Sequence, residues 1–305
     1  MDRVLDPAQI EALAARSIPR LILPGRDLFA RRAARLESLA TGHALEGYLR
    51  LCARIARRQQ TALERLRPAG PSAAEMARAA EHAMPPLPAR GLRRDAQWRL
   101  VLREMVAAIA SEEGLPPPVL AVCHALSVAG DAELDSYAER VLAGSGEDAE
   151  PAVALFVSAA LQVLWVALAT QLAPASVMLP GEPGPCPVCG SAAVASMVRS
   201  QAPYGGYRYL DCGLCATEWH RVRVECTQCG NTKHVAYQSI EGASGAVRAE
   251  TCDDCGTYRK IFYQEHDPAI EPLADDLASL ALDLLLTEAG FSRAGANPLY
   301  WQPRS

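Results

Sequence analysis

Eight of the ten cysteines in this chain form four Cys-x-x-Cys pairs within residues 186–255. The pairs are Cys186/Cys189, Cys212/Cys215, Cys226/Cys229 and Cys252/Cys255. Each cysteine of the first two pairs recurs 40 positions later, so the pattern C-x2-C-x22-C-x2-C occurs twice in tandem. A repeat of this kind indicates one supersecondary unit that is used twice.

Two cysteines separated by two residues can direct both thiolates at one ion. Two such loops complete a closed tetrahedral shell of four sulfurs, which suits zinc or a single iron. Gly190, Gly230 and Gly256 each follow the second cysteine of a pair, where a turn with positive φ is useful, whereas the second pair has Ala216 there. The repeat predicts one ion for the first and second pairs and another ion for the third and fourth. The alternative, in which the second and third pairs share an ion, stays open from the spacing.

Cysteines also serve proteins in three other ways. Disulfides need an oxidising compartment, and cysteine patterns in cytosolic proteins more often serve metal binding or catalysis. A thioredoxin-like redox motif needs one Cys-x-x-Cys beside a βαβ pattern, whereas four pairs lie here among short strand patterns. An iron–sulfur cluster is harder to exclude, because shells of four thiolates also hold such clusters. We expect two mononuclear ions and keep the iron–sulfur alternative open.

The composition is that of an ordinary soluble protein, with a net charge of −5 and 21% charged residues. The first residues show no basic segment followed by an apolar one, so no secretory signal is visible and we expect a cytoplasmic protein. The longest apolar run, residues 151–169, is long enough to span a membrane. Because it contains Ser158 and Gln162 and has no flanking Lys or Arg anchors, we interpret it as a buried helix, without membrane insertion.

Residues 1–180 are predicted to form an all-helical domain. Helical periodicity covers about 7–16, 26–41, 44–67, 72–82, 93–112, 116–128, 131–143 and 150–172, with breaks at Pro- and Gly-rich segments. Asp27, Ser72 and Asp131 are candidate N-caps, and Glu75 would complete a Ser-x-x-Glu capping box with Ser72.

The periodicity changes to two beyond the Pro/Gly-rich linker at 173–185. Short strands are predicted at 192–199, 206–211, 217–225, 233–240, 246–251 and 257–264. We therefore expect an α+β protein with a first four-cysteine module at 181–225 and a second at 226–266. Such modules have little apolar core, so metal binding should supply much of their folding energy, and the helical domain should survive loss of the first ion.

Helical periodicity returns at 268–290, and residues 267–305 are expected to form a C-terminal helix and tail that pack back on the modules. Four leucines are predicted to form the apolar face of this helix: Leu277, Leu280, Leu284 and Leu285.

Charge is unevenly distributed in the helical half. Residues 1–110 carry 19 Arg and 11 acidic residues, whereas residues 111–180 carry one Arg and nine acidic residues. Arg50, Arg54, Arg57 and Arg58 share one helix face by their spacing. This face is either a solvated surface or a docking surface for an acidic partner. Nucleic acid is not expected, because the whole chain is acidic and no basic, aromatic patch accompanies the cysteines.

The remaining candidates for chemistry are weak. His220, His234 and His266 lie near the cysteine pairs, but eight cysteines already complete two tetrahedra, so structural or surface roles are expected. Cys52 and Cys123 lie in apolar helical patterns and are interpreted as buried small hydrophobes. A closed four-sulfur shell leaves no position for a substrate, and the sequence shows no catalytic constellation. We therefore do not expect an enzyme.

Three segments together resemble a known family. CPVCGS, YRYLDCGLCATEWHRVRVECTQCG and ETCDDCGTYRKIFYQEHDP are similar to the FdhE family of formate dehydrogenase accessory proteins. The resemblance is dense from the first cysteine pair to the downstream helix, and the helical half agrees only in size and class. It implies a cytoplasmic protein with a helical domain and two rubredoxin-like (zinc-ribbon-like) modules. It also implies that the eight paired cysteines hold two mononuclear ions, with iron preferred and zinc allowed.

The resemblance further implies a role in maturing respiratory formate dehydrogenases, through contact with the molybdenum- or tungsten-containing catalytic subunit. Three hypotheses follow. The chain is an assembly factor, a rubredoxin-like protein that passes single electrons to its client, or an interaction protein in which zinc only stabilises the fold. Metal identity separates them, since zinc has no redox chemistry. A homodimer is compatible with each hypothesis.

Overall fold

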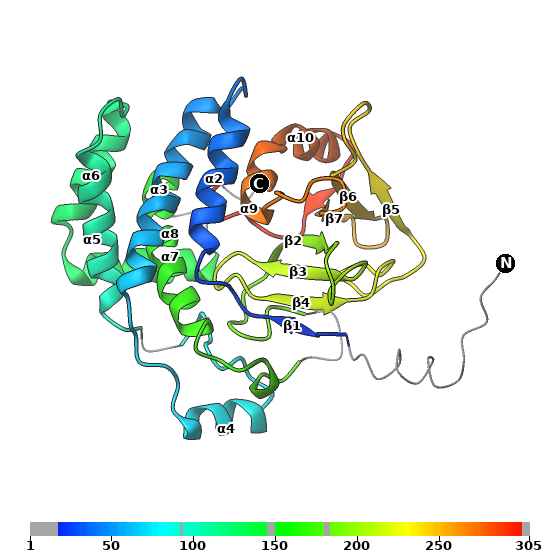
Figure 1. Ribbon diagram of the computed structural model, residues 1–305, viewed down its shortest axis with the longest axis horizontal. Coiled ribbons are helices and arrows are strands. Elements are labelled where there is room, and N and C mark those ends of the chain that lie inside the picture. The colour runs from blue at the N-terminus through cyan, green and yellow to red at the C-terminus, as the bar shows by residue number, and fades with distance from the viewer. Residues whose placement is uncertain (1–17, 92–93, 145–149, 180–183, 301–305) are drawn as a thin grey trace.

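The computed structural model describes residues 18–91, 94–144, 150–179 and 184–300. Its helical half contains α2 (Leu28–Ala40), α3 (Glu46–Arg65), α4 (Ala73–Glu81), α5 (Gln97–Ala110), α6 (Pro117–Val128), α7 (Asp131–Ala143), α8 (Pro151–Ala169) and the 3-10 turn η1 (Pro174–Ser176). These helices lie at the predicted places, and the predicted helix at 7–16 falls outside the described residues. Figure 1 shows the helices gathered at one side of the molecule and the strands at the other.

The predicted N-caps have three different outcomes. The capping box is confirmed, because the Ser72 side chain accepts from the Glu75 N–H and the Glu75 carboxylate accepts from the Ser72 N–H. Asp27 occupies the N-cap position of α2, but its side chain makes no capping hydrogen bond. Asp131 is the first residue of α7, whose N-cap is Gly130.

The apolar helix α8 forms the centre of the helical half. Every residue from Val153 to Ala169 is buried, and α3, α5, α6 and α7 pack around it. Although α8 is long and apolar enough to cross a membrane, 94% of its most apolar window is buried inside the protein. The prediction that it is a core helix is confirmed.

The second half contains one mixed sheet. Its strands are β1 (Leu21–Ile22), β2 (Ala193–Val198), β3 (Arg208–Cys212), β4 (Glu218–Arg221), β5 (Val235–Gln238), β6 (Val247–Cys252), β7 (Thr257–Tyr263) and β8 (Ser292–Arg293). Their order is β1-β4-β3-β2-β7-β6-β5, and β8 also pairs with β7. The α+β prediction, with a helical region followed by a strand region, is confirmed.

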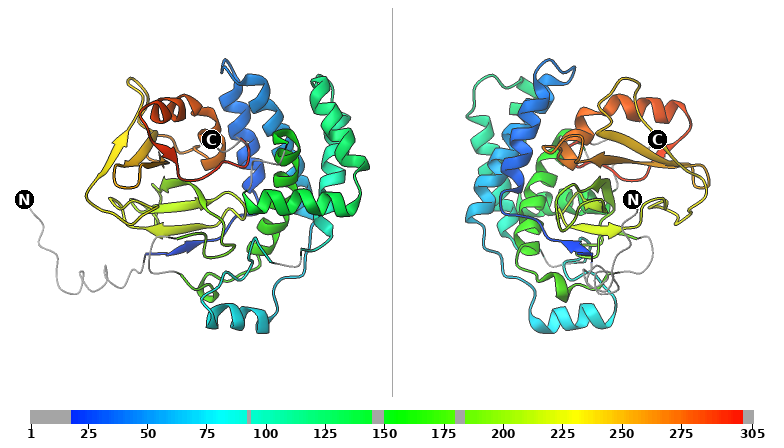
Figure 2. Two further views of the ribbon diagram at one scale, coloured as in Figure 1. Left: turned by 180° about the vertical axis from the view of Figure 1, so that it is seen from behind. Right: turned by 45° about the vertical axis from the view of Figure 1, so that its right-hand side comes forward.

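The tandem repeat is visible in the strand order. β2, β3 and β4 recur about 40 residues later as β5, β6 and β7. The two sets join where β2 runs parallel to β7, with Ser196 opposite Ile261. On the other side, β1 from the helical half adds to β4, with Leu21 opposite Trp219 (Figure 2). Both four-cysteine segments therefore belong to one continuous sheet, and the amino-terminal part of the chain extends it.

The C-terminal helix is broken in two, α9 (Pro272–Ala278) and α10 (Leu280–Glu288). At the break, the Ser279 hydroxyl donates to the Asp275 carbonyl, and the Lys260 ammonium donates to the Asp276 and Ser279 carbonyls. Carbonyls that would continue a single helix are thus satisfied by side chains. The break also shifts the apolar face of α10 relative to that of α9.

The predicted apolar face is consequently only half right. Leu277 is buried and Leu280 is partly buried, as predicted. Leu284 and Leu285 are 65% and 52% exposed, so the prediction is wrong for them. Leu273, Leu282 and Leu286 occupy the buried face instead, because the bend at Ser279 rotates the second helix.

Helix α9 also contacts the helical half. The Arg32 side chain of α2 pairs with Glu271 at 3.0 Å, and Arg35 pairs with Asp275 at 2.5 Å. Both carboxylates and the Arg32 side chain are less than 10% exposed. This segment therefore joins the strand region to the helices rather than packing on the four-cysteine modules alone.

Candidate metal centres

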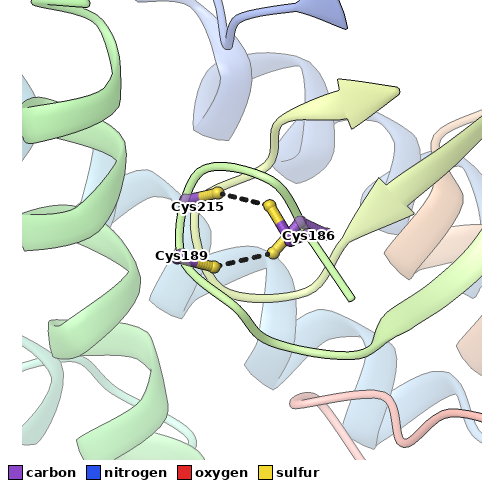
Figure 3. A group of neighbouring side chains, drawn as sticks. Cys186, Cys189 and Cys215 are labelled. Atoms are coloured by element: carbon purple, nitrogen blue, oxygen red, sulfur yellow. Dashed lines mark hydrogen bonds between the residues drawn. The ribbon is translucent and has the colours of Figure 1, made fainter. Parts of the chain in front are cut away.

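The first four-cysteine cluster contains Cys186, Cys189, Cys212 and Cys215. The first two lie in the loop before β2, and the others end β3 and begin the turn to β4. The sulfurs of Cys186 and Cys215 are 3.5 Å apart, and those of Cys189 and Cys212 are 3.4 Å apart. Figure 3 shows the side chains of Cys186, Cys189 and Cys215 converging on one point.

The second cluster contains Cys226, Cys229, Cys252 and Cys255 and repeats the first one. The sulfurs of Cys226 and Cys255 are 3.7 Å apart, and those of Cys229 and Cys252 are 3.8 Å apart. Each of these contacts joins the two cysteines that lie 40 positions after the corresponding pair in the first cluster. The eight cysteines are therefore grouped as the repeat predicts, and the second and third pairs do not share a cluster.

Both clusters fit a single ion. Four sulfurs at about 2.3 Å from a tetrahedrally coordinated ion are about 3.8 Å from one another. The ligand atoms of each cluster all lie within 4.8 Å of one another. Each shell is composed of four thiolates, the donor set that suits zinc or mononuclear iron. The two clusters are thus able to hold one metal ion each, and the assignment of individual cysteines as ligands remains a prediction.

All four Cys-x-x-Cys loops have the same backbone turn. After the second cysteine of each pair, a residue with positive φ donates its N–H to the carbonyl of the first cysteine, at 2.8 to 3.0 Å. Gly190, Gly230 and Gly256 fill this position in three loops, as predicted. Ala216 fills it in the second loop with φ of 54°, a conformation that disfavours residues with a Cβ. The first cluster therefore contains one strained loop.

A threonine follows the last cysteine of each cluster at the same distance along the chain. The hydroxyl of Thr217 lies 3.2 Å from the Cys215 sulfur, and that of Thr257 lies 3.0 Å from the Cys255 sulfur. A metal-bound thiolate can only accept, so both hydroxyls would donate to their clusters. Neither threonine was predicted from the sequence, although their 40-residue spacing is the signal that could have indicated them.

The thiols of the first cluster differ in the direction of their pKa shifts. Burial raises the pKa of Cys186 and Cys212 well above the usual range of a thiol. Burial also opposes ionisation of Cys189, yet hydrogen bonds from Cys186 and Cys212 outweigh it and hold the Cys189 pKa well below that range. A metal ligand must be a thiolate, so binding of an ion at this cluster releases protons.

The first cluster is embedded in the helical half. Its four cysteines are at most 1% exposed. The Leu87 N–H donates to the Val188 carbonyl at 2.9 Å, and the Ala89 N–H donates to the Cys189 carbonyl at 2.7 Å. The amide of Gln162, on α8, donates to the Gly213 carbonyl at 2.6 Å and is itself held by Gln59. Two loops of the cluster are therefore hydrogen-bonded to the helical core.

The second cluster lies nearer to solvent. Cys229 is exposed and Cys255 is partly exposed, whereas Cys226 and Cys252 are buried. It is carried by β6 and the loops around it, next to the edge strand β5. The two clusters thus have the same internal geometry but different surroundings.

The three histidines lie outside both clusters. His220 packs edge-on against Tyr207 and Tyr209, and His234 pairs with Asp254 at 2.8 Å. His266 lies against Tyr263. These contacts are structural or superficial, as predicted.

The other two cysteines are buried in helices. Cys52 is fully buried in α3, and burial raises its pKa to about 12. Cys123 is 1% exposed in α6, and burial raises its pKa to about 11. Both thiols stay protonated at neutral pH, which agrees with their interpretation as small hydrophobes.

The predicted arginine face is already paired within the chain. Arg50 and Arg57 contact Glu37 at 2.7 and 2.6 Å, while Arg54 and Arg58 contact Glu112 at 3.5 and 2.7 Å. A surface hollow of about 420 Å³ is lined by three of these arginines and three glutamates: Arg50, Arg54, Arg57, Glu37, Glu112 and Glu113. The paired glutamates come from α2 and from the turn after α5, and no local sequence pattern indicates that they pair with arginines of α3. Partner binding by this face remains a prediction.

Comparison with known proteins covers nearly the whole chain. Residues 18–182 match the family model "FdhE, N-terminal", residues 185–223 match "FdhE, central domain" and residues 224–300 match "FdhE, C-terminal domain". The chain is 40% identical over 301 residues to the protein FdhE homolog of Cronobacter sakazakii, covering 97% of this chain and 96% of that protein. It is 39% identical over 290 residues to the protein FdhE of Salmonella choleraesuis, covering 94% and 93%.

A solved structure shares the fold. The crystal structure of the FdhE protein from Pseudomonas aeruginosa aligns with a TM-score of 0.84 at 40% sequence identity. The alignment covers 92% of this chain and 99% of that one.

Proposed function

The chain belongs to the FdhE family, and on this basis we propose that it assists the formation of respiratory formate dehydrogenase by binding the catalytic subunit. The observation that carries the proposal is the pair of closed four-cysteine clusters within an FdhE-like chain. A closed shell has no open position for a substrate, which supports a binding role rather than catalysis. We therefore propose that the chain has no formate-oxidising activity of its own.

In this proposal each cluster holds one ion, with iron preferred and zinc as the alternative. Cys186, Cys189, Cys212 and Cys215 would hold the first ion, and Cys226, Cys229, Cys252 and Cys255 the second. Iron would supply one-electron chemistry, whereas zinc would stabilise the fold alone. The protein's own contribution is the fixed position of the thiolates and the donation from Thr217 and Thr257.

The two clusters would then have different tasks. The first is hydrogen-bonded to α8 and to Leu87 and Ala89, so it would support the surface that the helices present. The second has an exposed ligand in Cys229, so it is the cluster that a client protein can approach. We propose that client binding takes place in the cytoplasm, before export of the client.

A second function is favoured by that exposure. If the second cluster holds iron, Cys229 and the partly exposed Cys255 would provide a short path for electrons between the ion and a docked client. In this case the chain would act as a rubredoxin-like electron carrier during maturation. A colourless zinc protein would remove this alternative, since zinc does not change its oxidation state.

Co-purification tests the main proposal. The tagged chain, purified anaerobically from its own host, should retain the catalytic subunit of a formate dehydrogenase. A host strain lacking the gene for this chain should accumulate inactive formate dehydrogenase, and the purified chain alone should not oxidise formate. Failure to retain any formate dehydrogenase subunit, together with unchanged enzyme activity in the deletion strain, would refute the proposal.

A further inference from the structure

A buried guanidinium lies between the two clusters. Arg259 is on β7 and is only 5% exposed. Its Nε donates to the Thr227 hydroxyl at 2.9 Å, and Thr227 directly follows Cys226. Its Nη1 donates to the Ala193 carbonyl, and Ala193 pairs with Cys212 across β2 and β3. One side chain therefore hydrogen-bonds to a residue beside a ligand of each cluster.

The loop near the C-terminus fixes this guanidinium in place. A Cβ on Gly295 would lie 1.9 Å from the Ala193 oxygen and 2.9 Å from the Arg259 Nη1 atom. Only glycine allows the loop to approach so closely. The Ala294 carbonyl adds a third, longer contact to Nη2 at 3.5 Å. The side chain of Arg259 is therefore fixed by its hydrogen bonds to Thr227 and Ala193 and by the close approach of the loop at residues 294–295.

Among the residues that the structure describes, the charge of Arg259 has no carboxylate partner, in contrast to that of its neighbour Lys260. The Lys260 ammonium ion-pairs with Asp276 and with Asp283. Within the described part of the chain, no carboxylate lies within ion-pair distance of Arg259; its three hydrogen bonds go to a hydroxyl and two carbonyls. Glu250 faces Arg259 across β6 and β7, but its carboxylate accepts from Arg208 at 2.5 Å and from Tyr237 at 3.2 Å.

A buried cation without a partner is costly, because neutral hydrogen-bond acceptors replace only part of its hydration. Burial accordingly lowers the pKa of Arg259 to about 10, and the nearby Glu250 and Cys226 oppose this only in part. Four thiolates around a divalent ion carry a net charge of about −2. The two metal-loaded clusters would therefore supply the negative charge that Arg259 lacks.

We propose that Arg259 is the shared counter-ion of the two metal centres. Its positive charge stabilises both loaded four-thiolate shells and raises the affinity of each for its ion. The second centre depends on it more directly, because Thr227 lies inside the first loop of that centre. The proposal rests on metal binding by the clusters and is independent of the identity of the client protein.

The test separates the charge of Arg259 from its hydrogen bonds. The full chain is stripped of metal under anaerobic conditions and titrated with cobalt(II), whose thiolate absorption reports binding, against a competing chelator. Arg259→Gln keeps hydrogen-bonding ability but is neutral, whereas Arg259→Lys keeps the charge. Because a buried unit charge attracts a nearby shell of net charge about −2 appreciably even at an effective dielectric constant of about 20, we expect Arg259→Gln to weaken cobalt affinity by about tenfold or more at the second centre. Arg259→Lys should stay within about threefold of the parent chain.

Arg248→Gln is the matched control. Arg248 is on the adjacent strand β6 and packs over the Tyr263 ring, so its replacement removes the same charge at a partly exposed site. Its effect on cobalt affinity should be negligible, because water screens that charge. In protein loaded with iron, Arg259→Gln should also lower the reduction potential, since one added electron from the electrode makes the shell more negative.

Two results would overturn the proposal. The first is an Arg259→Gln variant with the affinity of the parent chain, which would make Arg259 a hydrogen-bonding residue only. The second is an Arg259→Lys variant that loses affinity as much as Arg259→Gln. If Arg259→Gln does not fold, Arg259→Lys decides alone: retained affinity supports the counter-ion role, and lost affinity refutes it.

Discussion

Loss of the first centre should destabilise the helical half of the protein, and loss of the second should not. The perturbation is the double variant Cys186→Ser/Cys189→Ser, with Cys226→Ser/Cys229→Ser as the matched control at the repeated position. The sequence alone predicts that the helices survive loss of the first ion. The structure alters that expectation for the first centre, because its loops are hydrogen-bonded to Leu87, Ala89 and Gln162.

The magnitude follows from the contacts at that junction. Three hydrogen bonds join the loops of the first centre to the helical half, each worth about 1 kcal/mol. Val188, between the first two cysteines, is fully buried, which adds about 2 kcal/mol. The sum of about 5 kcal/mol is near the lower limit of the total stability of a domain. For a unit of this size, it corresponds to a fall in Tm of roughly 10 to 20 °C.

Far-ultraviolet circular dichroism under anaerobic conditions gives the measurement, since most of its signal comes from α2–α8. The first double variant should unfold roughly 10 to 20 °C below the parent chain, and the control within about 5 °C of it. Limited proteolysis should cut the first variant within residues 18–179 and the control mainly beyond residue 224. Equal melting temperatures for the two double variants would refute the reasoning.

Three further predictions follow from the site. Gly213→Ala should destabilise the protein by about 1 to 3 kcal/mol, because the new Cβ would lie 2.5 Å from a Val194 methyl. The control Gly47→Ala, on α3 with open space around it, should not destabilise the protein, and thermal unfolding of the two variants measures the difference. When the metal-free chain is treated with an alkylating reagent, mass spectrometry should find the exposed Cys229 modified first and Cys52 unmodified. Only a thiolate reacts and the pKa of Cys52 is raised to about 12, so early modification of Cys52 would contradict this prediction. If the arginine face is the client surface, association should become about tenfold slower when four residues are replaced by Gln: Arg50, Arg54, Arg57 and Arg58. Salt at about 0.5 M should also weaken binding of the parent chain, and binding that responds to neither change would place the interface elsewhere.

Local signals predicted most of the elements and both clusters. Helix bounds followed from apolar periodicity and Pro/Gly breaks, and the Ser72–Glu75 capping box was readable from two residues. The grouping of the cysteines followed from the 40-residue repeat, because repeated spacing implies repeated geometry. These features depend on residues that are close in sequence or on an internal comparison.

Long-range contacts were not predictable in the same way. β1 consists of two residues beside Pro19 and Pro24 and becomes a strand only by pairing with β4, about 200 residues later. The break at Ser279 depends on Lys260 from β7, so Leu284 and Leu285 were placed on the wrong face. No local pattern indicates that Gln162 would reach the carbonyl of Gly213. In each case the deciding partner lies on another element.

Metal analysis of anaerobically purified protein tests the central claim most directly, namely that two closed four-thiolate shells each hold one ion. Elemental analysis of metal and of acid-labile sulfide should give two ions per chain and no sulfide, matching the two clusters. Iron with visible thiolate absorption would support the electron-carrying alternative, and zinc would remove it. Stoichiometric sulfide with about four irons per cluster, or protein that folds fully with no bound metal, would contradict the account.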